Sequence, residues 1–172
     1  MSDSVTTLPS LRYRDGKYVE PAPTLIRPDR LPFVEMVLTV IEQNPDQHQQ
    51  SWWGRAESHC RTTHCIAGWA CELDPDTTLV WTRSTPVDRV RYLDSVMVNR
   101  GPGHMAELPV AERAAELMGM DYDTTEAVFF NTLTEGSSLS TALGRESALT
   151  VLRKVIERTK QQLADEKAGV DL

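Results

Sequence analysis

The chain has 172 residues, of which 40% are hydrophobic, so we expect one ordinary domain with a core of its own. No apolar run approaches the ~18 residues of a membrane span, and residues 1–10 lack the basic start and apolar centre of a signal peptide. We therefore expect a cytoplasmic protein with three reduced cysteines and no membrane partner. Its net charge of −7 makes nucleic acid an unfavourable partner, because the phosphate backbone is also negative.

An extended arm is predicted for residues 1–29, which hold four of the ten prolines and show no helical period. Within this arm, residues 11–20 have the pattern of a β-hairpin, because Asp15-Gly16 suits a two-residue turn between β-forming residues. A two-stranded hairpin alone is marginally stable in water, so this one is expected to lie on the body of the protein or on a partner. A single domain is predicted for residues 30–168.

Five helices are expected from the 3.6-residue spacing of apolar residues, over residues 30–43, 62–73, 109–118, 123–130 and 145–167. The caps expected for the first, second and fourth of these helices are Asp29, Thr62 or Thr63, and Asp123. Gly68 stands inside the second helix, where glycine costs about 1 kcal/mol relative to alanine. We interpret it as a point where another element approaches the helix closely.

A short strand is predicted for residues 78–82, with residues 96–98 as its pairing partner, while residues 88–94 fit a helix equally well. Residues 101–104 carry a turn signal. The sum is an α+β fold that is mostly α: a compact domain of four to five helices with a small β hairpin or two-stranded sheet and an N-terminal arm.

All three cysteines and two of the four histidines lie within residues 58–73. One interpretation is a zinc site with Cys60, His64 and Cys65 as ligands, in a small zinc-stabilised domain that contacts nucleic acid. Zinc sites commonly use two short-spaced ligand pairs, however, and this segment offers only the one C-x4-C pair. Cys71 adds no second pair, because it is turned by roughly 120° from Cys65 around a helix axis.

A second interpretation of the same segment is a cysteine-dependent enzyme. Cys65 is expected in the first turn of a helix, where the dipole and the unpaired N–H groups favour a thiolate, and Cys60 has a histidine beside it. No signature identifies the orienting residue or the oxyanion site that such an enzyme needs. We rank first a third interpretation, packing in the core, where free cysteine behaves as a small apolar group. Its residues are Cys65, Ile66, Trp69, Ala70 and Leu73.

The segment from Cys60 to Trp69, C-R-T-T-H-C-I-A-G-W, resembles one in small proteins of actinobacteria and their phages, usually C-G-T-x-x-C-I-A-G-W or -H. The order of the neighbouring elements is also similar, over about residues 30–160. Arg61 departs from the glycine that is usual at its position. The resemblance implies a small helical domain that is phage-encoded and has no catalytic role.

The leading hypothesis is a non-catalytic binding or regulatory protein, phage-encoded, that acts on a host or phage protein through protein–protein contact. The candidate interface residues are five aromatic side chains: Tyr13, Tyr18, Trp52, Trp53 and Trp81. No cofactor is expected under this hypothesis, and zinc is expected only under the first alternative. The sequence leaves the oligomeric state open.

Overall fold

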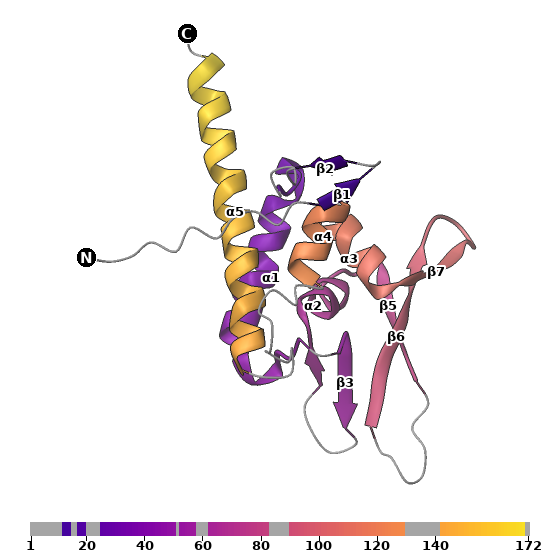
Figure 1. Ribbon diagram of the computed structural model, residues 1–172. Helices are drawn as coiled ribbons and strands as arrows, with labels where there is room; N and C mark the ends of the chain where they lie inside the picture. Colours follow the sequence, from indigo (N-terminus) through magenta and orange to yellow (C-terminus); the bar gives the residue numbers. More distant parts are fainter. Residues whose placement is uncertain are drawn as a thin grey trace.

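A computed structural model describes residues 12–14, 17–19, 25–50, 52–57, 62–82, 90–129 and 142–170. Over these residues the chain forms five α-helices, a five-stranded antiparallel sheet and a separate two-stranded hairpin near the N-terminus (Figure 1). The α+β class is therefore confirmed, and the sheet is larger than the predicted two strands. None of the helices in the described ranges combines the length and the apolar content needed to cross a membrane.

Each of the five predicted helices is present. Their bounds are α1 Leu31–Gln43, α2 Ile66–Glu72, α3 Val110–Met118, α4 Tyr122–Phe129 and α5 Ala142–Val170. Short 3-10 turns flank α1, η1 (Pro28–Arg30) before it and η2 (Pro45–Gln47) after it. Local signals explain several boundaries: Pro32 lies in the first turn of α1, and Gly119 ends α3 in the left-handed conformation, with φ of 62°.

The caps predicted for α1 and α4 are wrong. The N-cap of α1 is Arg30, without a capping side chain, because η1 places Asp29 one residue too early. At α4 the carboxylate of Asp121, rather than that of Asp123, accepts a hydrogen bond from the Thr124 N–H at 2.7 Å. The sequence spacing locates both helices but misplaces their first residues by one or two positions.

The cap of α2 also differs from the prediction. Thr63 belongs to strand β4 (Thr63–His64), which pairs with β3 (Gly54–Glu57) and keeps the chain extended up to α2. The N-cap is Cys65, whose sulfur accepts a hydrogen bond from the Gly68 N–H at 3.4 Å. The Cys65 sulfur therefore caps α2, where a threonine hydroxyl was predicted to be the cap.

The remaining strands of the sheet are β5 (Thr77–Trp81), β6 (Val90–Asn99) and β7 (Met105–Pro109). The strand order is β4-β3-β6-β5, and β7 pairs with the C-terminal half of β6. The predicted pairing of residues 78–82 with residues 96–98 is confirmed, whereas a helix over residues 88–94 is wrong where the chain is described, since β6 begins at Val90.

Strand β7 was not predicted. It follows a tight turn in which Gly101 and Gly103 have φ of 135° and 73°, values that favour glycine. This turn brings the chain back onto β6, so the sheet gains a strand. The predicted N-terminal hairpin is present as β1 (Arg12–Arg14) and β2 (Lys17–Val19).

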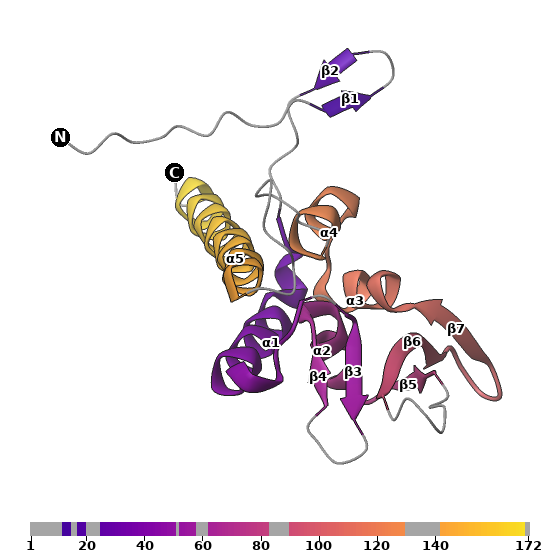
Figure 2. The same cartoon turned by 60° about the horizontal axis from the view of Figure 1, so that its bottom comes forward.

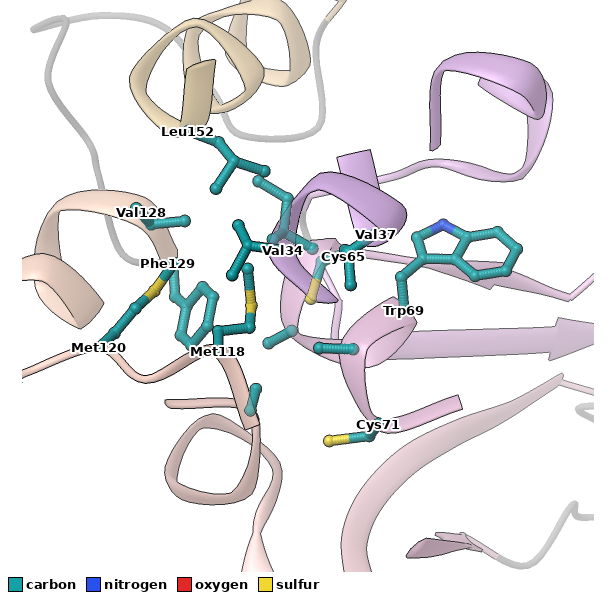
Figure 3. Packing of buried hydrophobic residues seen from close by; sticks show 14 of the residues in the cluster. Val34, Val37, Cys65, Trp69, Cys71, Met118, Met120, Val128, Phe129 and Leu152 are labelled. Atoms are coloured by element: carbon teal, nitrogen blue, oxygen red, sulfur yellow. The ribbon is translucent and has the colours of Figure 1, made fainter. Parts of the chain in front are cut away.

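Helix α2 lies at the centre of the molecule, between α1 and the sheet (Figure 2). Six of its seven residues are buried, so it is apolar on all sides rather than along one stripe. Side chains from all five helices meet in this core (Figure 3). The packing interpretation is thus confirmed for Cys65, Ile66, Trp69 and Ala70, and Leu73 packs half-buried at the edge of the cluster.

The end of the predicted arm belongs to the same core. Ile26 is 2% exposed, and its N–H donates a hydrogen bond to the Thr159 hydroxyl of α5 at 3.0 Å. The backbone of Ile26 also forms a β-bridge with Met120. Residues from Ile26 onward therefore pack with the body of the protein.

Candidate functional site

The two cysteines within the described residues, Cys65 and Cys71, are buried as neutral thiols. Burial raises the pKa of Cys65 to about 12, although the backbone N–H of Gly68 opposes the shift. Burial likewise raises the pKa of Cys71 to about 12, and its sulfur donates a hydrogen bond to the Val110 carbonyl at 3.7 Å. The expected activation of Cys65 by the helix N-terminus is thus outweighed by desolvation.

Gly68 is required by a close approach of the chain, as predicted. A Cβ atom at this position would lie 1.8 Å from the carbonyl oxygen of Trp53, the residue just before β3. The same carbonyl accepts a hydrogen bond from the Cys65 N–H at 3.3 Å. The glycine therefore lets the backbone of one element touch that of another.

His64 is enclosed by aromatic rings on the inner face of the sheet. It is 3% exposed, and its ring centroid lies 5.3 Å from that of Trp69 and 5.8 Å from that of Trp81. A Cβ atom on Gly54 would lie 2.8 Å from His64 Nδ1, which has no hydrogen-bond partner among the described residues. Burial lowers the pKa of His64 to about 4, against a smaller raising effect of the Trp53 backbone, so the imidazole is neutral at neutral pH.

The proposed zinc ligands are engaged in other contacts where they are described. Cys65 caps α2, and His64 packs between two tryptophan rings. Cys60 lies outside the described residues. Within the described ranges, no three His, Cys, Asp or Glu side chains gather closely enough to hold a metal ion.

The outer face of the sheet carries an aromatic pair of which one ring, Trp52, is exposed and the other, Tyr92, is half-buried. Cross-strand pairing places Arg55 of β3 opposite Tyr92 of β6, and the pattern of burial along β3 puts both on the solvent side. Trp52 is 49% exposed, and its ring centroid lies 4.7 Å from that of Tyr92. Arg55 and Glu57 form an ion pair of 2.7 Å on the same face. We call Trp52, Arg55, Glu57 and Tyr92 the outer aromatic patch.

The five predicted interface residues have different environments. Trp52 is exposed, whereas Trp53 and Trp81 are half-buried against the core, and the Arg91 guanidinium lies 5.9 Å from the centroid of the Trp81 ring. Tyr13 and Tyr18 are paired opposite each other in the N-terminal hairpin, and their side chains lie outside the described part of the structure.

Sequence reasoning missed Tyr92. No sequence signal in V-R-Y-L from residue 90 could have found it, because a period of two places Tyr92 on the same face as the apolar Val90 and places Leu93 with the charged Arg91.

Comparison with protein-family models, with curated proteins and with solved structures finds no match for this chain. The resemblance of the Cys60–Trp69 segment to proteins of actinobacteria and their phages therefore stays a prediction. Part of that segment has a structural explanation: Cys65 caps α2, Gly68 admits the Trp53 carbonyl, and Trp69 packs on His64.

Proposed function

We propose that this chain is a non-catalytic, phage-encoded binding protein that acts through protein–protein contact, with the outer aromatic patch as its contact site. The observation that carries the proposal is the half-exposed ring of Trp52, held against Tyr92 on the solvent side of the sheet. The patch combines tryptophan, tyrosine and arginine, the residue types that most often dominate the energy of protein interfaces.

The geometry of the patch favours a partner protein as its target. The Trp52 ring packs on Tyr92 of strand β6, so it is already partly ordered and little side-chain entropy is lost when it is buried. The Arg55–Glu57 ion pair gives the patch a charged rim beside an apolar centre. The neutral thiols of Cys65 and Cys71 support the non-catalytic part of the proposal, and the resemblance of the Cys60–Trp69 segment supports phage origin.

The test is site-specific photo-cross-linking in an actinobacterial extract. A photoreactive phenylalanine analogue at position 52 is compared with the same analogue at Tyr122, which is 73% exposed on α4. We expect one partner to be captured from position 52 only. Trp52→Ala should then weaken the affinity for that purified partner by about thirtyfold, since a central interface tryptophan is typically worth about 2 kcal/mol. Equal capture from both positions, or unchanged affinity of Trp52→Ala, would refute the proposal.

A further inference from the structure

The free edges of the five-stranded sheet differ in how they are protected. An edge strand exposes backbone N–H and C=O groups that another strand can pair with, and natural sheets block this pairing with charges, proline, short strands or a covering segment. Strand β4 has two residues, and it is bridged to His48 on the side away from β3. Strand β7 contains Glu107 and Pro109, and proline has no N–H to donate. Both of these edges are therefore protected.

Strand β5 forms the end of the strand order opposite to β4, and it lacks these protections (Figures 1 and 2). Its sequence, T-T-L-V-W, contains no charged residue and no proline, and every residue except Leu79 is β-branched or aromatic. The extra residue of the bulge between β5 and β6 is Asp94 of β6, so β5 itself runs without interruption. Among the described strands, β5 is thus the edge most open to pairing.

The backbone groups of β5 point alternately towards β6 and away from it. Just outside the two ends of the strand, the Asp76 carbonyl and the Thr82 N–H are bonded to β6 at 3.4 Å and 2.9 Å. Because the direction alternates along an antiparallel strand, the N–H and C=O groups of Leu79 and Trp81 point to the open side, together with the Thr77 carbonyl. No described backbone group outside β5 is bonded to them. They are available to a further strand.

We propose that β5 pairs with β5 of a second copy of this chain, antiparallel and centred on Leu79. In this register, Leu79 of each copy donates to and accepts from Leu79 of the other copy, and each Trp81 N–H donates to the Thr77 carbonyl of the other copy. The Thr77 N–H is already bonded to the Asp74 carbonyl at 3.2 Å, and the pairing leaves that bond intact.

The side chains of β5 are complementary to those of an identical strand. Thr78 lies opposite Val80 of the second copy, and Thr77 lies opposite Trp81, so β-branched and aromatic residues meet in cross-strand pairs that stabilise a sheet. Two charged strands of one sequence would repel each other where like charges meet, and β5 carries no charge. For the same reason β5 offers no charge that would select a foreign strand. Its self-complementary pattern meets the condition for a two-fold interface between identical chains.

The pairing has a consequence for the outer aromatic patch. Residues directly opposite each other in an antiparallel pair point to the same face, so the outer faces of the two sheets lie on one side. The dimer then presents two copies of the patch together, which raises the avidity for a partner that has two sites. This consequence rests on the proposed function, whereas the pairing of β5 does not and can fail while that function stands.

Sedimentation equilibrium of the purified full-length protein tests the pairing. Two five-residue strands bury less than about 1,200 Å², so we expect a weak dimer with a dissociation constant on the order of 100 µM. Thr78→Lys places a charge on an exposed position opposite Val80 of the second copy, and it should weaken the dimer by at least about tenfold. Met105→Lys is the matched control: this side chain is 48% exposed on the other edge strand, β7, so the dimer should be unchanged.

Amide hydrogen exchange identifies the strand that pairs. The amides of Leu79 and Trp81 should exchange about fourfold more slowly at about 1 mM protein than at about 10 µM, whereas those of Thr78 and Val80 point to β6 and should not change. A chain that stays monomeric at about 1 mM overturns the proposal. So does a dimer in which the Leu79 amide gains no protection, or one that Thr78→Lys weakens no more than Met105→Lys does.

Discussion

Replacing Gly68 with alanine tests the contact between α2 and the residue that leads into β3. The new Cβ atom would lie 1.8 Å from the Trp53 carbonyl oxygen, 1.6 Å less than the 3.4 Å at which ordinary contact begins. The obstacle is backbone, so it cannot rotate away as a flexible side chain would. The strands or the helix must move instead, and that movement weakens the 3.3 Å hydrogen bond from the Cys65 N–H to the same carbonyl.

The expected cost follows from three contributions. Overpacking of a buried site costs up to about 3 kcal/mol, and a weakened buried hydrogen bond adds about 1 kcal/mol. The higher helix propensity of alanine returns about 1 kcal/mol. We therefore expect Gly68→Ala to lower the free energy of unfolding by about 3 kcal/mol, measured by urea denaturation followed by tryptophan fluorescence.

Gly169→Ala is the matched control, since a Cβ atom there meets nothing within 4 Å near the end of α5. This variant should be neutral or slightly stabilising, by less than about 1 kcal/mol. If Gly68→Ala were as stable as the parent protein, the close approach of α2 and Trp53 would not exist in solution, and the explanation of the glycine would be wrong.

Three further predictions concern titration and charge. Burial lowers the pKa of His64 from 6.5 in the unfolded chain to about 4 in the folded one, so the unfolded chain takes up the proton first as the pH falls. The contribution of neutral His64 to the free energy of unfolding is therefore fully present above about pH 6.5. It declines by up to about 3 kcal/mol towards pH 4. His64→Gln should lose this part of the pH dependence, whereas a variant of the exposed His104, His104→Gln, should keep it. In a Cys60→Ser background, Cys65 and Cys71 should resist alkylation by iodoacetamide at about pH 8 until denaturant is added, because both thiols are buried and protonated. Rapid labelling of either thiol in the native state would contradict their burial. Asp74→Ala should lower the free energy of unfolding by about 2 kcal/mol, because it removes the 2.6 Å ion-pair partner of Arg113, whose side chain is only 11% exposed. Glu42→Ala at the exposed ion pair with Arg153 should lower it by less than about 1 kcal/mol. Equal losses in denaturant titrations would show that burial of the Asp74 pair is unimportant.

The sequence by itself determined the helices and the reason for one glycine. Helical spacing is a local signal, and Pro32 and Gly119 act on the backbone within one turn, so all five helices were located without tertiary information. Gly68 was recognised because its conformational cost inside an apolar helix needs compensation from elsewhere. The burial of Cys65 and Trp69 followed from the same apolar pattern.

Only the tertiary structure decided how many strands the sheet has and which aromatic side chains are exposed or packed in the core. A strand is stabilised by its cross-strand partners, so the five residues of β7 do not predict a strand by themselves. The glycine turn before β7 brings these residues back onto β6, and that pairing makes them a strand. Trp52 and Trp53 are neighbours in sequence, yet the pairing of β3 with β6 leaves one ring exposed on Tyr92 and packs the other against the core. The low pKa of His64 likewise arises from desolvation by groups distant in sequence, because burial is a property of the packed fold.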